Sequence, residues 1–272
     1  MDAKIEAAPS RESDSRRALK PDTRRADCNL EFTTHPDIKI QKLIIGSERA
    51  PLLMIDSLID DADALVELAA RKHYGDVVSY YPGIRAKTPL TYQQFILDKF
   101  RGLIGEFFEL EPRSLRFTDC HFSIVTTPAD KLEYLQRIPH TDSMFGTELA
   151  MLHYLFKRNL GGTAFYRHRK TGFEYVDFAR RPSYLACVDQ ESNGPDRPAA
   201  GYITGSTPLY EQISAQEGTF NRLLMYRRNS LHSGNIAPDF IPDPNPRSGR
   251  LSINGFLAAN AAFAADSVPD LR

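Results

Sequence analysis

The chain has 272 residues, of which 42% are hydrophobic, enough apolar material for one large domain or two small ones. Its 34 basic and 35 acidic residues leave a net charge of −1, so we expect no nucleic-acid partner. The longest apolar-rich stretch, residues 256–265, is too short to span a bilayer, and we therefore expect no membrane association.

The first 30 residues are rich in charge and poor in apolar side chains, a composition that buries too little surface to order itself. We therefore expect residues 1–30 to form a disordered tail and residues 31–272 to form a single domain. Recurrent isoleucine and leucine residues predict a strand over 37–45, and Ala50-Pro51 is expected to break the chain after it.

Two helices are predicted next. Asp60 or Asp61 can cap the first helix, which runs to about His73 with its leucine and valine residues on one side. The second helix begins near Thr91, carries apolar residues at spacings of three and four, and ends before Pro112.

An aromatic loop lies between these helices, with the sequence Tyr80-Tyr81-Pro82-Gly83-Ile84-Arg85. Loops of this composition often line a pocket, because binding residues gather on connections that a rigid scaffold holds in place. A simple surface turn is the alternative. We take Tyr81 and Arg85 as candidate substrate contacts.

Beyond Ser114 the sequence changes to short runs of β-branched and aromatic residues separated by turn residues, which is typical of a sandwich or jelly roll. Leucine spacing in one run, 148–156, also fits a buried helix, but the glycines that follow favour a strand. Residues 189–216 are rich in glycine, proline and serine and are expected to form a long loop, or a pair of short hairpins, beside the substrate entrance. The predicted strands cover 115–126, 138–142, 148–156, 162–167, 174–178, 183–188, 220–226 and 250–257.

The candidate metal site begins with His140-Thr141-Asp142. If this segment is extended, side chains two residues apart share a face, so His140 and Asp142 point the same way. His232 follows 92 residues later (232 − 140) and must arrive from a distant strand. Two imidazoles and one carboxylate leave three positions of an octahedral iron(II) open, which leads to the hypothesis of a non-haem iron oxygenase.

The order of several short blocks resembles a known group. His140-Thr141-Asp142 is followed by Tyr154-Leu155, by Gly161-Gly162-Thr163, by Leu231-His232-Ser233-Gly234 and by Gly249-Arg250. This order is similar to that of the 2-oxoglutarate and iron(II)-dependent dioxygenases of the prolyl-4-hydroxylase-like group, over about residues 115–258. The resemblance implies a double-stranded β-helix, mainly β with flanking helices.

The resemblance also implies the cofactors and their ligands. Iron(II) would be bound by His140, Asp142 and His232, and the distal carboxylate of the co-substrate 2-oxoglutarate would pair with Arg250. A guanidinium can bind a carboxylate through two parallel hydrogen bonds. Ser252 and Tyr154 would lie near the same carboxylate. Because 18 residues (250 − 232) and four prolines separate Arg250 from the distal histidine, alternative anchors stay open: Arg222, Arg247, Arg227 and Arg228.

The implied reaction is hydroxylation by dioxygen of a small molecule or an amino-acid side chain, with release of succinate and CO2. Arg167, in the cluster Arg167-His168-Arg169, is a further candidate substrate contact, although a solvated turn would look the same. The rivals are a non-catalytic cupin-like protein that binds a metal or sugar and a zinc hydrolase with the same ligands. Three cysteines without disulfide or zinc spacing (Cys28, Cys120 and Cys187) favour reduced thiols and a cytoplasmic location.

Overall fold

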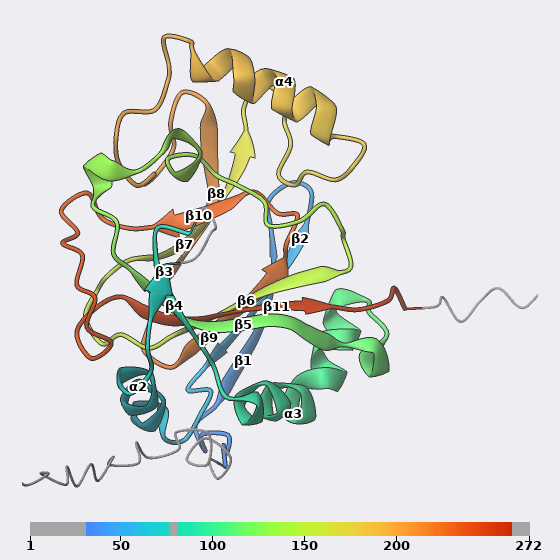
Figure 1. Ribbon diagram of the computed structural model, residues 1–272. Coiled ribbons are helices and arrows are strands. Elements are labelled where there is room, and N and C mark those ends of the chain that lie inside the picture. Colours follow the sequence, from blue (N-terminus) through green and yellow to red (C-terminus); the bar gives the residue numbers. More distant parts are fainter. Residues whose placement is uncertain (1–30, 77–80, 263–272) are drawn as a thin grey trace, which may run out of the picture. The chain divides into compact units, whose positions relative to one another are not determined.

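The structure, a computed structural model, describes residues 31–76 and 81–262. The predicted tail, Tyr80 of the aromatic loop and Cys28 lie outside these residues. In the part described, two antiparallel sheets carry the fold (Figure 1). Short β-branched runs predicted this mainly β architecture, and the structure confirms it.

The larger sheet has eight strands in the order β1-β2-β9-β6-β11-β5-β4-β3. Every pairing in it is antiparallel, and a β-bulge interrupts the β11–β5 pairing after Phe256. The strands are β1 (Lys39–Ile45), β2 (Ala50–Asp56), β3 (Gly75–Asp76), β4 (Gly83–Lys87), β5 (Arg116–Val125), β6 (Glu148–Tyr154), β9 (Arg222–Arg227) and β11 (Leu251–Ala258).

The smaller sheet contains β10 (His232–Asn235), β7 (Gly162–His168) and β8 (Tyr210–Glu217), in that order. An isolated bridge between His140 and His232 adds a fourth position beside β10. We number eight positions along the chain from β5 (position 1) to β11 (position 8), with the bridge at His140 as position 2. The core of the large sheet then has the order 1-8-3-6, and the small sheet has the order 2-7-4-5. That order, in which the chain alternates between sheets, is a jelly roll, or double-stranded β-helix, as expected.

Helices cover the outer faces of both sheets (Figure 1). The two predicted helices, α2 (Ala62–Ala70) and α3 (Leu90–Phe108), share a core with the large sheet. As predicted, the Asp61 side chain caps α2 by accepting from the Ala64 amide at 2.9 Å. The third helix, α4 (Arg181–Ser192), packs Tyr184 and Val188 against the small sheet. Within the residues described, no helix is long and apolar enough to cross a membrane.

Several local predictions were wrong. Residues 183–188, predicted as a strand, belong to helix α4. Its buried residues, Tyr184 and Val188, are four positions apart, which is the spacing of one side of a helix. Residues 138–142 and 174–178 each pair only through a single bridge, at His140 and Tyr175. Ala50-Pro51 opens strand β2, because proline is tolerated at the first positions of a strand. The aromatic loop is continued by strand β4, and the end of the segment 189–216 forms the start of strand β8.

Three buried polar side chains form a hydrogen-bonded row in the core between α3 and the large sheet. The Tyr92 hydroxyl lies 3.1 Å from Nδ1 of His153, and Nε2 of His153 lies 3.1 Å from Oδ1 of Asn221. Asn221, whose φ is +61°, also exchanges two hydrogen bonds with the backbone of Ile59. Because that amide oxygen can only accept, Nε2 carries the proton and Nδ1 accepts from Tyr92. Burial lowers the pKa of His153 to about 4.

Candidate metal and co-substrate site

The two candidate histidines are held together by the backbone. The His140 amide donates to the His232 carbonyl at 2.9 Å, and the His232 amide donates back to the His140 carbonyl at 3.0 Å. Their ring centroids are 4.5 Å apart. A 92-residue separation therefore closes at one reciprocal bridge, and the relative position of the two imidazoles is set by main-chain hydrogen bonds rather than by side-chain packing alone.

The hydrogen bonding of the His232 ring suits a metal ligand. Its Nδ1 lies 3.0 Å from the Ser230 carbonyl, which can only accept, so the proton resides on Nδ1. Nε2 then has the lone pair that can bind a metal, and it lies 3.5 Å from Oδ2 of Asp142. Tyr226 contacts the buried ring edge to face, with centroids 4.8 Å apart. A backbone carbonyl that fixes the tautomer in this way is the usual support of a metal-bound histidine.

Asp142 is held from behind by Arg228. The Asp142 amide donates to the Arg228 carbonyl at 2.8 Å, and Nη2 of Arg228 donates to the Asp142 carbonyl at 2.9 Å. Nη1 of Arg228 binds Glu148 at 2.7 Å, and its guanidinium carbon lies 4.0 Å from the ring centre of Phe256. These contacts consume the backbone groups of Asp142, and leave its carboxylate facing the two histidines.

The three side chains offer one ligand atom each, and those atoms lie within 4.8 Å of one another. Oδ1 of Asp142 is 3.7 Å from Nε2 of His140. Desolvation by the surrounding protein, and then the neighbouring His232, lower the pKa of His140 to about 4, although 49% of its side chain is exposed. His140 is therefore neutral at pH 7. Two imidazoles and a carboxylate are a donor set that fits a divalent metal, and His140, Asp142 and His232 are the residues that would hold it.

Arg250 lies immediately before β11 and is 4% exposed. Its Nε donates to the Leu160 carbonyl at 2.9 Å and its Nη2 donates to the Gly162 carbonyl at 2.8 Å. Gly161, between these two carbonyls, has a φ of +85°, a conformation that favours glycine. The predicted glycine turn thus has a specific task, because its shape aims two carbonyls at the guanidinium.

The chain between β10 and Arg250 folds back on itself. The amides of Ser248 and Gly249 both donate to the Asn245 carbonyl, at 3.2 and 2.7 Å. The Ser248 carbonyl accepts a hydrogen bond from Arg158 at 2.5 Å. The position of Arg250 therefore depends on the glycine turn and on this closed loop, and the 18-residue separation from His232 does not prevent the two from belonging to one site.

Tyr154 and Ser252 stand opposite each other on β6 and β11. The Tyr154 hydroxyl lies 2.6 Å from Oγ1 of Thr163, and the Ser252 hydroxyl donates to Oδ1 of Asn254 at 2.7 Å. Burial raises the pKa of Tyr154 while Arg250 lowers it, which places the phenol close to that guanidinium. The structure therefore gathers these two predicted residues at the Arg250 end of the large sheet.

The alternative arginines are bound elsewhere. Arg222 pairs with both carboxylate oxygens of Asp56, and Arg247 pairs with both oxygens of Glu67. Arg228 binds Glu148 as described above, and Arg227 donates to the carbonyls of Gly146 and Phe108. Within the residues described, neither Arg250 nor Arg227 has a carboxylate within ion-pair distance. Arg227 binds the carbonyl of Phe108 in helix α3, on the outer side of the large sheet, so Arg250 is the candidate that keeps a charge to offer between the sheets.

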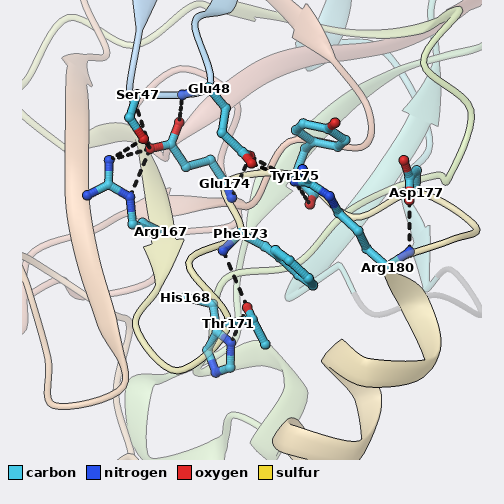
Figure 2. A network of polar contacts seen from close by, with 10 residues as sticks. All are labelled: Ser47, Glu48, Arg167, His168, Thr171, Phe173, Glu174, Tyr175, Asp177 and Arg180. Atoms are coloured by element: carbon cyan, nitrogen blue, oxygen red, sulfur yellow. Dashed lines mark hydrogen bonds and ion pairs between the residues drawn. The ribbon is translucent and has the colours of Figure 1, made fainter.

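Arg167 takes part in a separate network (Figure 2). Its guanidinium donates to Glu174, to Glu211 and to the Ser47 hydroxyl. The Glu174 carboxylate is 1% exposed and also accepts from the amides of Ser47 and Glu48, which belong to the turn between β1 and β2. These contacts occupy the Arg167 donors and join the β1–β2 turn to the small sheet, so Arg167 is not carried into the site.

Sequence reasoning missed the residues that support the metal ligands. Ser230 and Arg228 lie just before His232 in the chain, but nothing in their identity announces a carbonyl that fixes a tautomer or a guanidinium that holds the loop of Asp142. Tyr202, in the loop expected at the entrance, was also not singled out. Its hydroxyl donates to the Thr127 carbonyl at 2.7 Å, and burial and the charge of Tyr81 raise its pKa while Arg250 lowers it.

A jelly roll that gathers two histidines and an aspartate beside its small sheet defines a class, the double-stranded β-helix proteins with a metal-binding donor set. Over residues 36–257 the chain matches the model of a family described as "Family of unknown function (DUF6445)". The chain belongs to that family. A comparison with curated proteins finds no match.

Three solved structures illustrate what the fold is similar to. The non-heme alpha ketoglutarate dependent epimerase SnoN from nogalamycin biosynthesis has 12% identity and a TM-score of 0.45, covering 83% of this chain and 87% of its own. HygX from Streptomyces hygroscopicus, with nickel and 2-oxoglutarate bound, has 10% identity and a TM-score of 0.43, covering 78% and 84%. The carbocyclase SnoK from nogalamycin biosynthesis has 9% identity and a TM-score of 0.40, covering 78% and 81%. The fold assignment rests on the strand order given above.

Proposed function

We propose that the protein is an iron(II)- and 2-oxoglutarate-dependent dioxygenase that hydroxylates a small molecule or an amino-acid side chain and releases succinate and CO2. The observation that carries the proposal is the pairing of a His140–Asp142–His232 donor set with Arg250, a buried guanidinium that has no carboxylate partner among the residues described. When bound, iron(II) and 2-oxoglutarate together supply the activation of dioxygen.

The distance between the metal ligands and Arg250 is suitable for one ligand that contacts both. The Arg250 guanidinium binds the Gly162 carbonyl, and Gly162 lies three residues before Phe165, the pairing partner of His232. Three residues of strand span about 10 Å. A five-carbon dicarboxylate fills such a gap when one end is held by a metal and the other accepts a hydrogen bond from the guanidinium. A metal or sugar binder has no need of the cation at that distance.

The residues of the site have separate roles in this proposal. His140, Asp142 and His232 bind the metal through neutral nitrogens and one carboxylate oxygen. Arg250 orients the co-substrate by its distal carboxylate, and Ser252 and Tyr154 offer hydroxyl groups at the same end. Arg228 holds the loop of Asp142 without touching the metal.

The test measures metal content, 2-oxoglutarate affinity and succinate formation for the wild type and for three variants. Asp142→Ala and His232→Ala should lose metal and succinate formation while keeping the far-ultraviolet circular dichroism. Arg250→Ala should bind metal normally but bind 2-oxoglutarate about ten- to a hundredfold more weakly, because one charge-assisted contact contributes about 1.5–3 kcal/mol.

Arg247→Ala is the matched control, since this exposed arginine already has Glu67 as its partner. Full turnover by both ligand variants would end the proposal. Turnover of an ester or amide with zinc and without dioxygen would replace it with a zinc hydrolase.

A further inference from the structure

Strand β4 places a second arginine in the same cross-strand row as the co-substrate residues. Arg85 is paired with Ser123 on β5, Ser123 with Ser252 on β11, and Ser252 with Tyr154 on β6. Directly opposed residues on an antiparallel sheet point to the same face. Tyr154 packs with Phe165 of the small sheet, so this row faces the space between the two sheets.

The neighbours of Arg85 along its strand confirm this orientation. Ile84 and Ala86 pack into the core that the large sheet shares with helices α2 and α3. Because side chains alternate along a strand, Arg85 must project from the opposite face. The sequence did not decide whether the aromatic loop lines a pocket or forms a surface turn. The strand that continues this loop places its arginine toward the interior of the jelly roll.

Arg85 and Arg250 act on the same phenol. The guanidinium carbon of Arg85 lies 4.3 Å from the ring centre of Tyr81. Burial raises the pKa of Tyr81, while the charges of Arg250 and Arg85 lower it. Two cations that influence one hydroxyl group through space must both lie near it, which brings the two arginines to the same end of the site.

Arg250 is buried and Arg85 is partly buried, and neither has the acidic partner that such a cation normally requires. Nε of Arg85 is buried and has no hydrogen-bond partner, and neither Arg85 nor Arg250 has a carboxylate within 4 Å, in each case among the side chains described. Arg222 and Arg228, on or next to strand β9 of the same sheet, each bind an acidic side chain. Withdrawing a charge from water without a counter-charge is costly, so a bound anion would offset that cost at Arg250 and part of it at Arg85.

We propose that Arg85 is a second anchor for the distal carboxylate of 2-oxoglutarate, which lies between its guanidinium group and that of Arg250. This inference rests on the function proposed above. The row that contains Arg85 is level with Thr163, because the Tyr154 hydroxyl contacts that residue. Thr163 is two residues, or about 7 Å of strand, from Phe165 and the level of His232. Arg85 therefore serves the co-substrate end of the site and not the metal end, where the oxidised group of the substrate must lie.

The experiment measures binding of two keto acids to the full chain by calorimetry, without dioxygen and with Mn(II) as the metal. 2-Oxoglutarate carries the distal carboxylate, and 2-oxopentanoate lacks it. Arg85→Ala should weaken 2-oxoglutarate binding about tenfold, as expected for the loss of one charge-assisted contact, and should leave 2-oxopentanoate binding unchanged. Arg85→Lys, which keeps the charge and is the milder change for folding, should weaken it by a smaller factor.

Lys87→Ala is the matched control, because Lys87 lies two residues further along the same strand face and is exposed. Equal 2-oxoglutarate affinity in the wild type and in both Arg85 variants would overturn the inference and return Arg85 to the substrate. Equal weakening of both keto acids would also overturn it, since the effect would then not depend on the distal carboxylate. If the wild-type protein with Mn(II) binds neither keto acid, it is the proposed function that fails.

Discussion

The buried histidine of the core gives a prediction with a worked magnitude. His153 is 0% exposed and is held neutral between Tyr92 and Asn221. Its pKa falls from 6.5 to about 4 in the folded protein, because burial disfavours the charged ring. One pKa unit corresponds to about 1.4 kcal/mol, so this single group removes about 3 kcal/mol of folding free energy in acid.

The sign follows from where the proton binds. Between pH 6.5 and about 4 the unfolded chain takes up a proton on His153 and the folded chain does not, so stability falls as the pH falls through this window. Above pH 7 both states are neutral and the group makes no pH-dependent contribution. Below pH 4 the full loss is reached.

The assay compares the wild type with His153→Gln by urea unfolding of metal-free protein between pH 7.5 and pH 4. At pH 7.5 the variant should be less stable by about 1–3 kcal/mol, because Tyr92 loses its acceptor. By pH 4 the wild type should have lost about 3 kcal/mol more than the variant, so that the difference closes or reverses. His73→Gln, at an exposed position, should show a flat difference. A constant difference between His153→Gln and the wild type at every pH would refute the reasoning.

Two further predictions concern the supports of the site. Gly161→Ala should cost more stability than Gly172→Ala and should also weaken 2-oxoglutarate binding; both glycines have positive φ, but only at Gly161 would the new Cβ meet backbone, 2.0 Å from the Asn235 carbonyl oxygen. Equal melting temperatures for the two variants would contradict this. Glu174→Gln should destabilise the protein by about 2–4 kcal/mol in urea unfolding, because it leaves Arg167 without its buried partner. Glu211→Gln, with a 41% exposed side chain on the same arginine, should cost under about 1 kcal/mol.

Local pattern was sufficient for much of the fold. The long β-branched run that became β5 and the helices α2 and α3 have one buried side and clear end signals, so their periodicity predicted them to within a few residues. Helix α4 and strand β8 were missed because their sequences are polar at most positions. Helix α4 is ordered by the one apolar side that packs against the small sheet, and β8 is ordered by its pairing with β7 in that sheet.

The candidate site likewise contains residues that the sequence suggested and residues that only the structure reveals. Residue types alone suggested the metal ligands, since His-x-Asp and a distant histidine are a recognisable donor set, and the structure brings all three together. The roles of Arg228 and Ser230 depend on backbone carbonyls whose direction only tertiary structure fixes. The choice of Arg250 over Arg222 and Arg247 depended on which arginines already bind an acid, and no sequence pattern carries that information.

The closed loop between β10 and β11 separates the position of Arg250 from the length of the segment that precedes the loop. Arg250 is placed by the carbonyls of Leu160 and Gly162 and by a turn whose amides return to Asn245. We therefore expect residues added or removed before that turn to leave the guanidinium in place. A search pattern for related proteins should therefore fix the glycine turn and the arginine and let the gap after the distal histidine vary. The same segment is a suitable position for an inserted tag or reporter.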